Sequence, residues 1–167
     1  MQLPVLLLCM CALVTFTSAA RLLLIPFDHH GHVNFFSIVA QELTSRGHTI
    51  DMVVADRSKH IPKKHGLNAI VAPYTVELAP QHFEKVAFGE GSVLSSALAV
   101  SSQTKIQIRD IFADASFMDK LKANNYDLML VDGIDIGRMH YLIPYTLGVK
   151  YITLTARNDP WLARVPS

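Results

Sequence analysis

Residues 21–55 combine two buried apolar runs with a helical stretch between them, and this unit constrains the fold more than any other feature. Residues 21–26 form a continuous apolar run typical of a strand buried in a parallel sheet, and residues 49–55 form another. Between the two runs, apolar residues from 35 to 43 follow helical spacing, and Gly47 suits the left-handed position that ends a helix. The stretch therefore predicts a βαβ crossover.

The rest of the chain continues the alternation of strands and helices. Asn34 is the predicted N-cap of the first helix, which leaves His32 in the loop before it. Further strands are predicted at 69–74, 126–132 and 149–154, and further helical segments at 81–125 and 137–147. This order predicts an α/β fold, a Rossmann-like parallel sheet flanked by helices on both faces, with doubly wound strand order.

Composition supports a domain with a hydrophobic core and excludes a nucleic-acid partner. Half of the residues are hydrophobic, 17% are charged, and the formal net charge is +1. A domain of roughly 150 residues buries about 68–70% of its unfolded surface, which is enough to hold a fold together. A near-neutral chain lacks the basic surface that binding to phosphate backbones requires, so no nucleic acid is expected.

The first twenty residues predict a secretory signal peptide. Residues 3–16 are almost wholly apolar, and small residues follow, which predicts cleavage after Ala20 and a mature domain of residues 21–167. Both cysteines, Cys9 and Cys11, would leave with this segment, so no disulfide is expected. A retained membrane anchor is the alternative, although the apolar run is shorter than the ~20 residues of a comfortable span.

His32 and Asp132 are the candidate catalytic pair. Each sits at the carboxyl end of a predicted buried strand, and the carboxyl ends of parallel strands form the ligand crevice of open α/β sheets. A carboxylate bonded to one ring nitrogen fixes the tautomer of an imidazole, whose other nitrogen can then act as general base. The alternative from spacing alone is a polar loop histidine and an unrelated helix-capping aspartate.

Other site types find less support. His29, His30 and His32 invite a metal interpretation, but adjacent histidines in a turn point apart and the chain has no H-E-x-x-H motif, so no metal is expected. The segment 89–91 lacks the third glycine and the preceding strand of a dinucleotide fingerprint. Most phenylalanines are expected in the core, while those between 83 and 117 are candidates for an apolar pocket.

Four segments resemble the UDP-glycosyltransferases, including the animal UDP-glucuronosyltransferases. They are the strand ending at residues 24–27, the segment 31–36 (GHVNFF), the segment 42–50 (ELTSRGHTI) and the strand 126–132 (YDLMLVD). The order and spacing of these segments cover nearly the whole chain. Gly31 stands where serine is common in the family, and the proline–cysteine pair usual after the strand aspartate is absent.

The resemblance implies the N-terminal half of a GT-B glycosyltransferase fold and an inverting transfer of sugar from a UDP-sugar to a small lipophilic acceptor. His32 aligns with the catalytic base and Asp132 with its partner aspartate. Phe35, Phe83 and Phe88 are the expected acceptor contacts. The UDP-sugar is a co-substrate, and no cofactor is expected.

The resemblance also implies what this chain lacks. In the family a C-terminal domain holds the donor, and a membrane helix with a basic tail follows it. The chain instead ends in a loop after its last predicted strand, so we expect a fragment that is inactive alone and meets the membrane only through the missing segment. Localisation in the endoplasmic reticulum is implied, or secretion if the truncation is real. The alternative is a non-catalytic secreted or luminal binder of lipophilic small molecules. The acceptor, the sugar and the oligomeric state are not specified by the sequence.

Overall fold

The computed structural model describes residues 19–76, 92–134 and 139–155. Its described strands form one sheet, and all four neighbouring pairs are parallel. The strands are β1 (Arg21–Ile25), β2 (Thr49–Val54), β3 (Asn68–Val71), β4 (Leu128–Asp132) and β5 (Tyr151–Leu154), in the order β3-β2-β1-β4-β5. The predicted α/β class and the doubly wound order are confirmed.

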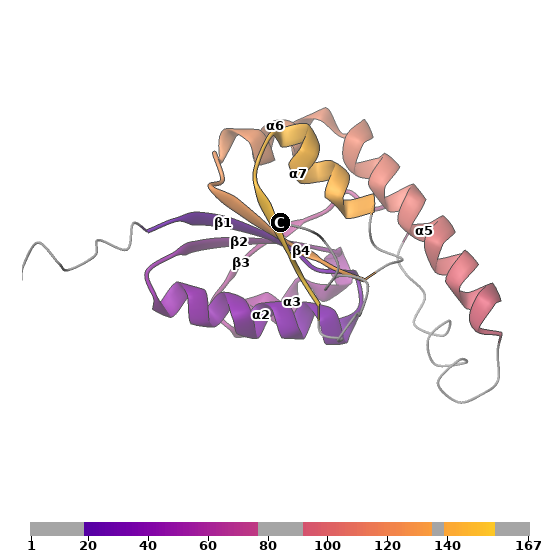
Figure 1. Ribbon diagram of the computed structural model, residues 1–167, viewed down its shortest axis with the longest axis horizontal. Coiled ribbons are helices and arrows are strands. Elements are labelled where there is room, and N and C mark those ends of the chain that lie inside the picture. The colour runs from indigo at the N-terminus through magenta and orange to yellow at the C-terminus, as the bar shows by residue number, and fades with distance from the viewer. Residues whose placement is uncertain (1–18, 77–91, 135–138, 156–167) are drawn as a thin grey trace, which may run out of the picture.

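Helices cover both faces of this sheet (Figure 1). One face carries α2 (His30–Ser45) and α3 (His60–Lys64), and a short 3-10 helix, η1 (Asp56–Ser58), follows β2. The other face carries α5 (Val93–Ala113), α6 (Ala115–Ala123) and α7 (Leu142–Leu147). No helix within these described segments is both long enough and apolar enough to cross a membrane.

Alternating side chains of the strands divide the core into two layers. In β1, Leu22 and Leu24 pack with Val33 and Phe36 of α2, whereas Leu23 and its neighbour two residues on pack with α5, α6 and α7. Because side chains in a strand point alternately to opposite faces, a run without polar residues fills both layers. The two-sided burial that the apolar runs predicted is therefore present.

Helix α2 begins earlier than the sequence indicated. Its N-cap is His29, whose side chain makes no capping hydrogen bond, and Asn34 lies exposed in the second turn. The prediction of Asn34 as N-cap was wrong, and His32 belongs to the first helical turn and not to a loop. The C-terminal prediction was right, since Gly47 has a φ of +91°.

The buried face of α2 also differs from the predicted one. Val33, Phe36, Ser37 and Ala40 are buried, whereas Ile38 is 54% exposed. Ser37 can enter the core because its hydroxyl donates to the carbonyl of Val33, at 2.8 Å. A pattern search that treats serine as polar and surface-facing misses this rotation of the helix.

Several other boundaries are shorter than predicted. The strands predicted at 69–74, 126–132 and 149–154 correspond to β3, β4 and β5, and the helix predicted at 137–147 corresponds to α7. Within the predicted helical stretch 81–125, the described elements are α5 and α6, separated at Asp114, which caps α6 by accepting from the amide of Phe117 at 2.9 Å. The signal peptide, both cysteines and the segment 89–91 lie outside the described residues.

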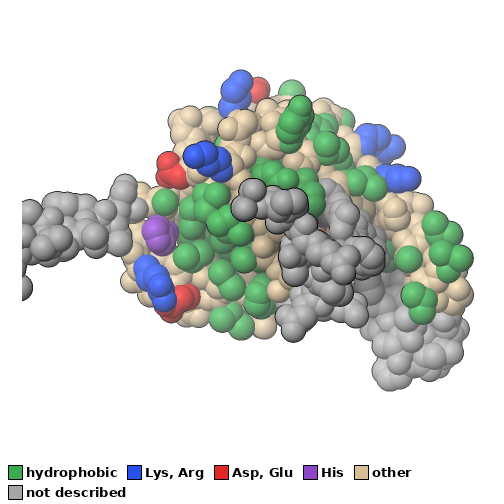
Figure 2. All heavy atoms as spheres, in the orientation of Figure 1, with side chains coloured by type: hydrophobic (Ala, Val, Ile, Leu, Met, Phe, Trp, Pro, Cys, Tyr) green, Lys and Arg blue, Asp and Glu red, His purple; other side chains and the backbone are tan. Residues whose placement is uncertain are grey.

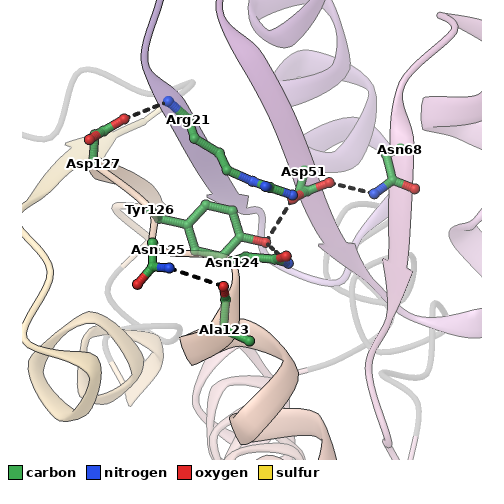
Figure 3. A network of polar contacts seen from close by, with 8 residues as sticks. All are labelled: Arg21, Asp51, Asn68, Ala123, Asn124, Asn125, Tyr126 and Asp127. Atoms are coloured by element: carbon green, nitrogen blue, oxygen red, sulfur yellow. Dashed lines mark hydrogen bonds and ion pairs between the residues drawn. The ribbon is translucent and has the colours of Figure 1, made fainter.

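A buried carboxylate ties the amino-terminal ends of three strands together (Figure 3). Asp51 of β2 is 3% exposed and accepts from the Arg21 guanidinium at 3.2 Å, from the Tyr126 hydroxyl at 2.8 Å and from the Asn68 amide. Burial, and next the hydrogen bond to Asp51, raise the pKa of Tyr126, so its hydroxyl stays a protonated donor. The network sits at the opposite end of the strands from His32.

We expect Asp51→Ala to lower the free energy of unfolding by about 1–3 kcal/mol, because it leaves buried donors without their acceptor. Urea denaturation of the variant and the parent protein measures this change. Glu42→Ala is the matched control, since Glu42 pairs with Arg46 at 2.7 Å on an exposed helix surface, where such pairs contribute ~0–1 kcal/mol. Equal changes in the two variants would contradict a structural role for the Asp51 network.

Candidate active site at the carboxyl edge of the sheet

The carboxyl ends of β1 and β4 lie side by side. The two strands are neighbours in the sheet, with Ile25 paired to Val131, so Asp132, the last residue of β4, lies beside the end of β1. The chain then turns through residues 26–29 into α2, whose first turn carries His32. Because only residues 26–29 separate β1 from α2, the N-terminus of the helix lies at the same edge of the sheet, where β4 also ends.

His32 and Asp132 are in direct contact. His32 Nδ1 lies 2.7 Å from Asp132 Oδ2, across a separation of 100 residues in sequence. The Asp132 side chain is 1% exposed, and that of His32 is 21% exposed. The predicted proximity of the two residues is confirmed, while their catalytic role stays a prediction.

Asp132 is held by two backbone amides as well. Its Oδ2 accepts from the amide of Phe27 at 3.1 Å, and its Oδ1 accepts from the amide of Ile134 at 3.1 Å. With both oxygens engaged, the carboxylate has a fixed orientation toward His32. A carboxylate can only accept, so Nδ1 of His32 carries the proton in this contact and Nε2 is the nitrogen that can take one.

The ring of Phe27 packs against the imidazole of His32. The Phe27 ring is 0% exposed and lies edge-on to His32, with 5.6 Å between ring centroids. Phe27 also packs with Val100 of α5 and with Ile134 after β4. The wall on this side of His32 is therefore apolar and is built from three segments of the chain.

His29 approaches the same imidazole from the preceding turn. Its ring centroid lies 6.0 Å from that of His32, and the rings are nearly perpendicular. Burial lowers the pKa of His29, and the charges of His32, Arg57 and His30 lower it further, whereas Asp28 raises it. At neutral pH His29 is therefore a neutral imidazole beside the candidate base.

A metal site finds no support in the described part of the chain. Within residues 19–76, 92–134 and 139–155, no three histidine, cysteine, aspartate or glutamate side chains gather closely enough to hold an ion. His29 and His32 meet ring to ring, and His30 is exposed on the first turn of α2.

The three predicted acceptor contacts fare differently. Phe35 is half-buried, packs against the core between the sheet and α2, and lies edge-on to Phe36 at 5.7 Å. Its contacts here are those of a core side chain, and its acceptor role stays a prediction. Phe83 and Phe88 lie outside the described residues.

Sequence reasoning missed three polar residues beside the dyad. Asp28, in the turn after β1, is 3% exposed, and it binds Arg57 of η1 and Gln107 of α5. Asp28 stands next to the histidine cluster, and the basic segment that contains Arg57 resembles a solvated loop. No signal in a single sequence distinguishes a buried aspartate from an exposed one at such a position.

Comparison with known proteins gives a consistent picture. No family model matches the chain. In sequence the chain is 25% identical, over 146 residues, to UDP-glucuronosyltransferase 1A8 of Rattus norvegicus, which covers 80% of this chain and 27% of that enzyme. The chain thus spans about a quarter of the length of this curated relative.

The similar solved structures are glycosyltransferases. The SsfS6 glycosyltransferase of Streptomyces sp. SF2575 superposes with a TM-score of 0.62 at 15% identity, over 83% of this chain and 40% of that one. SnogD from Streptomyces nogalater superposes with a TM-score of 0.57 at 14% identity, over 83% and 35%. At these identities the likeness establishes the fold.

The described sheet, with its helices on both faces, is thus a Rossmann-like unit of the GT-B glycosyltransferase fold. Within that class, the similarity to UDP-glucuronosyltransferase 1A8 confirms the resemblance to the UDP-glycosyltransferases that the sequence motifs predicted.

Proposed function

We propose that residues 21–167 are the acceptor-binding part of a UDP-glycosyltransferase, which transfers a sugar to a hydroxyl of a small lipophilic acceptor. The observation that carries this proposal is the 2.7 Å contact between His32 and the buried Asp132 at the carboxyl edge of the sheet. Similarity to a UDP-glucuronosyltransferase supports the donor class, and SsfS6 has also been solved in complex with thymidine diphosphate, a nucleoside diphosphate.

The dyad suits a single displacement with inversion. Nε2 of His32 takes the proton of the acceptor hydroxyl while the oxygen attacks the anomeric carbon of the sugar. The bond from that carbon to the phosphate oxygen breaks, and its electron pair leaves with UDP. Asp132 accepts from Nδ1 throughout and stabilises the imidazolium that forms.

The exposed apolar surface of helix α5 supports the proposal that the acceptor is lipophilic. Its first turns carry exposed apolar side chains, Val93, Leu94 and Leu98, each more than 60% exposed. Figure 2 shows hydrophobic side chains gathered on this projecting end of α5. Further along, Val100 packs on Phe27 beside His32, so the same helix leads from an apolar surface toward the candidate base. Exposed apolar patches of this kind are typical of binding surfaces.

The donor requires further residues in this proposal. UDP-sugar is a co-substrate held chiefly by a second, C-terminal domain, and the chain matches 27% of the relative's length. A second exposed apolar area, with Leu142 and Tyr145 on α7 and Tyr151 and Ile152 on β5, offers a surface for further chain (Figure 2). We propose the secretory pathway as its location, with membrane attachment through a C-terminal segment.

We expect the 167-residue chain, expressed through a secretory pathway, to bind lipophilic phenols or alcohols but to turn over no UDP-sugar. Loss of donor positioning forfeits ~7–11 kcal/mol of barrier lowering. Calorimetric titration with a panel of phenols measures the first property, and transfer from radiolabelled UDP-sugars measures the second. Robust turnover by this chain alone would overturn the division into two halves.

An assay of the longest natural polypeptide that contains residues 21–167 distinguishes the two candidate functions. A transferase yields radiolabelled glycoside from at least one UDP-sugar and a phenol that the shorter chain binds. A non-catalytic carrier of lipophilic molecules binds the same phenols and yields no glycoside with any UDP-sugar. The second result would refute the proposed reaction.

A further inference from the structure

The turn that leads into the dyad helix is very tight. Between β1 and α2 only residues 26–29 connect the two elements, and the amide of His29 donates to the carbonyl of Phe27 at 2.7 Å. Asp28 is therefore the central residue of a three-residue turn. The same turn supplies the Phe27 amide that holds Asp132, so its conformation bears on both members of the dyad.

A single guanidinium nitrogen grips this turn at two points. Arg57 Nη2 donates to the backbone carbonyl of Asp28 at 3.0 Å and to its carboxylate Oδ2 at 3.1 Å. Gln107 Nε2, from the other side of the sheet, donates to the same Oδ2 at 3.2 Å. Arg57, which is 29 positions from Asp28 in sequence, thus fixes both its backbone and its side chain. Gln107, which is 79 positions away, fixes the side chain.

The charges explain why a cation stands here. The Asp28 side chain is 2% exposed, and a buried carboxylate is costly without a paired charge. Arg57, whose side chain is 29% exposed, supplies that charge at 3.1 Å from Asp28 Oδ2. The carboxylate that His32 contacts is that of Asp132, at 2.7 Å.

We propose that Asp28 and Arg57 are positioning residues that fix the orientation of His32 toward Asp132. This inference rests on the proposed function of the dyad. It adds residues of η1 and of the β1–α2 turn to the machinery, and neither touches the reacting atoms. In this arrangement Arg57 fixes the β1–α2 connection at Asp28. That connection sets the orientation of the first helical turn of α2, which carries the imidazole of His32.

The orientation of His32 can be measured without substrate. In ¹⁵N-labelled protein, ring nitrogen shifts report whether His32 keeps the single tautomer with the proton on Nδ1, and the exchange rate of that proton reports how well it is held. We expect Arg57→Gln to give averaged ring shifts and an at least ~10-fold faster exchange of the Nδ1 proton, about the loss of one charge-assisted hydrogen bond. Arg46→Gln, which removes an exposed pair at the far end of α2, should leave both unchanged.

The pKa of His29 provides a second readout of the same variant. Arg57 is one of the charges that lower it, so Arg57→Gln should raise the pKa of His29. The remaining influences are burial and the charges of His32, His30 and Asp28, and they stay in place. An unchanged pKa would show that the Arg57 charge does not act at the turn.

Two outcomes decide the proposal. If Arg57→Gln lowers the melting temperature but leaves the His32 ring shifts and proton exchange as in the parent, Arg57 is merely structural and the proposal fails. If Arg57→Gln does not fold, the double variant Asp28→Asn/Arg57→Gln removes the unpaired buried charge. The proposal then requires loss of the single His32 tautomer in that double variant, and an unchanged tautomer overturns it.

The measurement is independent of the proposed function. Suppose that Arg57→Gln loses the single His32 tautomer as expected, and that the longest natural polypeptide yields no glycoside. That result would support the positioning role of Arg57 and refute the proposed reaction. In a working transferase the same substitution should lower kcat and leave the acceptor KM within ~2-fold, since Arg57 does not touch the acceptor.

Discussion

His32→Ala is expected to lower turnover by ~10²–10⁴-fold in the longest natural polypeptide that contains this domain, because general-base catalysis contributes about that factor. Acceptor binding should change little, since the methyl group of alanine leaves the apolar walls made by Phe27 and Val100 in place. Initial rates with a radiolabelled UDP-sugar and calorimetric titration with the acceptor measure the two effects.

His30→Ala is the matched control for that experiment. His30 is two residues away on the same first turn of α2, and its side chain is exposed. A base at His32 predicts that His30→Ala retains activity within ~2-fold. Equal losses in both variants would instead point to a shared role of the histidine cluster and would remove the case for His32 alone.

The sequence predicted the sheet well because buried parallel strands leave a strong signal. The central residues of these runs, 22–25 and 128–131, carry only apolar side chains, which is typical of strands buried on both faces. Helix boundaries carried less information. The start of α2 is set by the turn at Asp28 and its tertiary contacts, so the local preference of Asn34 for a capping position did not decide it.

The dyad could be predicted because topology fixes it. Once β1 and β4 are adjacent parallel strands, residues that follow their carboxyl ends must meet, whatever the intervening hundred residues do. The contacts that hold Asp28 in the β1–α2 turn could not be predicted in this way. Arg57 and Gln107 reach Asp28 through side-chain conformations, and neither the strand order nor the hydrophobic pattern specifies those.

Asp132→Asn is expected to have a double effect. Asp132 accepts three hydrogen bonds, from His32 Nδ1, from the Phe27 amide and from the Ile134 amide. An asparagine offers one acceptor oxygen and one donor nitrogen, so at least one buried donor faces another donor. Such a mismatch costs about 1–3 kcal/mol of unfolding free energy, which urea denaturation of the chain measures.

The same substitution should slow the reaction more than it weakens acceptor binding. If the asparagine oxygen turns toward His32 Nδ1, the tautomer is kept but the negative charge that stabilises the imidazolium is gone; if the amide nitrogen turns there, the proton is forced to Nε2 and the base is blocked. We therefore expect turnover to fall by at least ~10²-fold in the longest natural polypeptide that contains this domain, with acceptor affinity within ~3-fold.

Asp127→Asn is the control, because Asp127 lies exposed before β4 and accepts from the amide of Arg21 at the opposite end of the strands. A rate for Asp132→Asn equal to that of the control would show that His32 acts without its carboxylate partner.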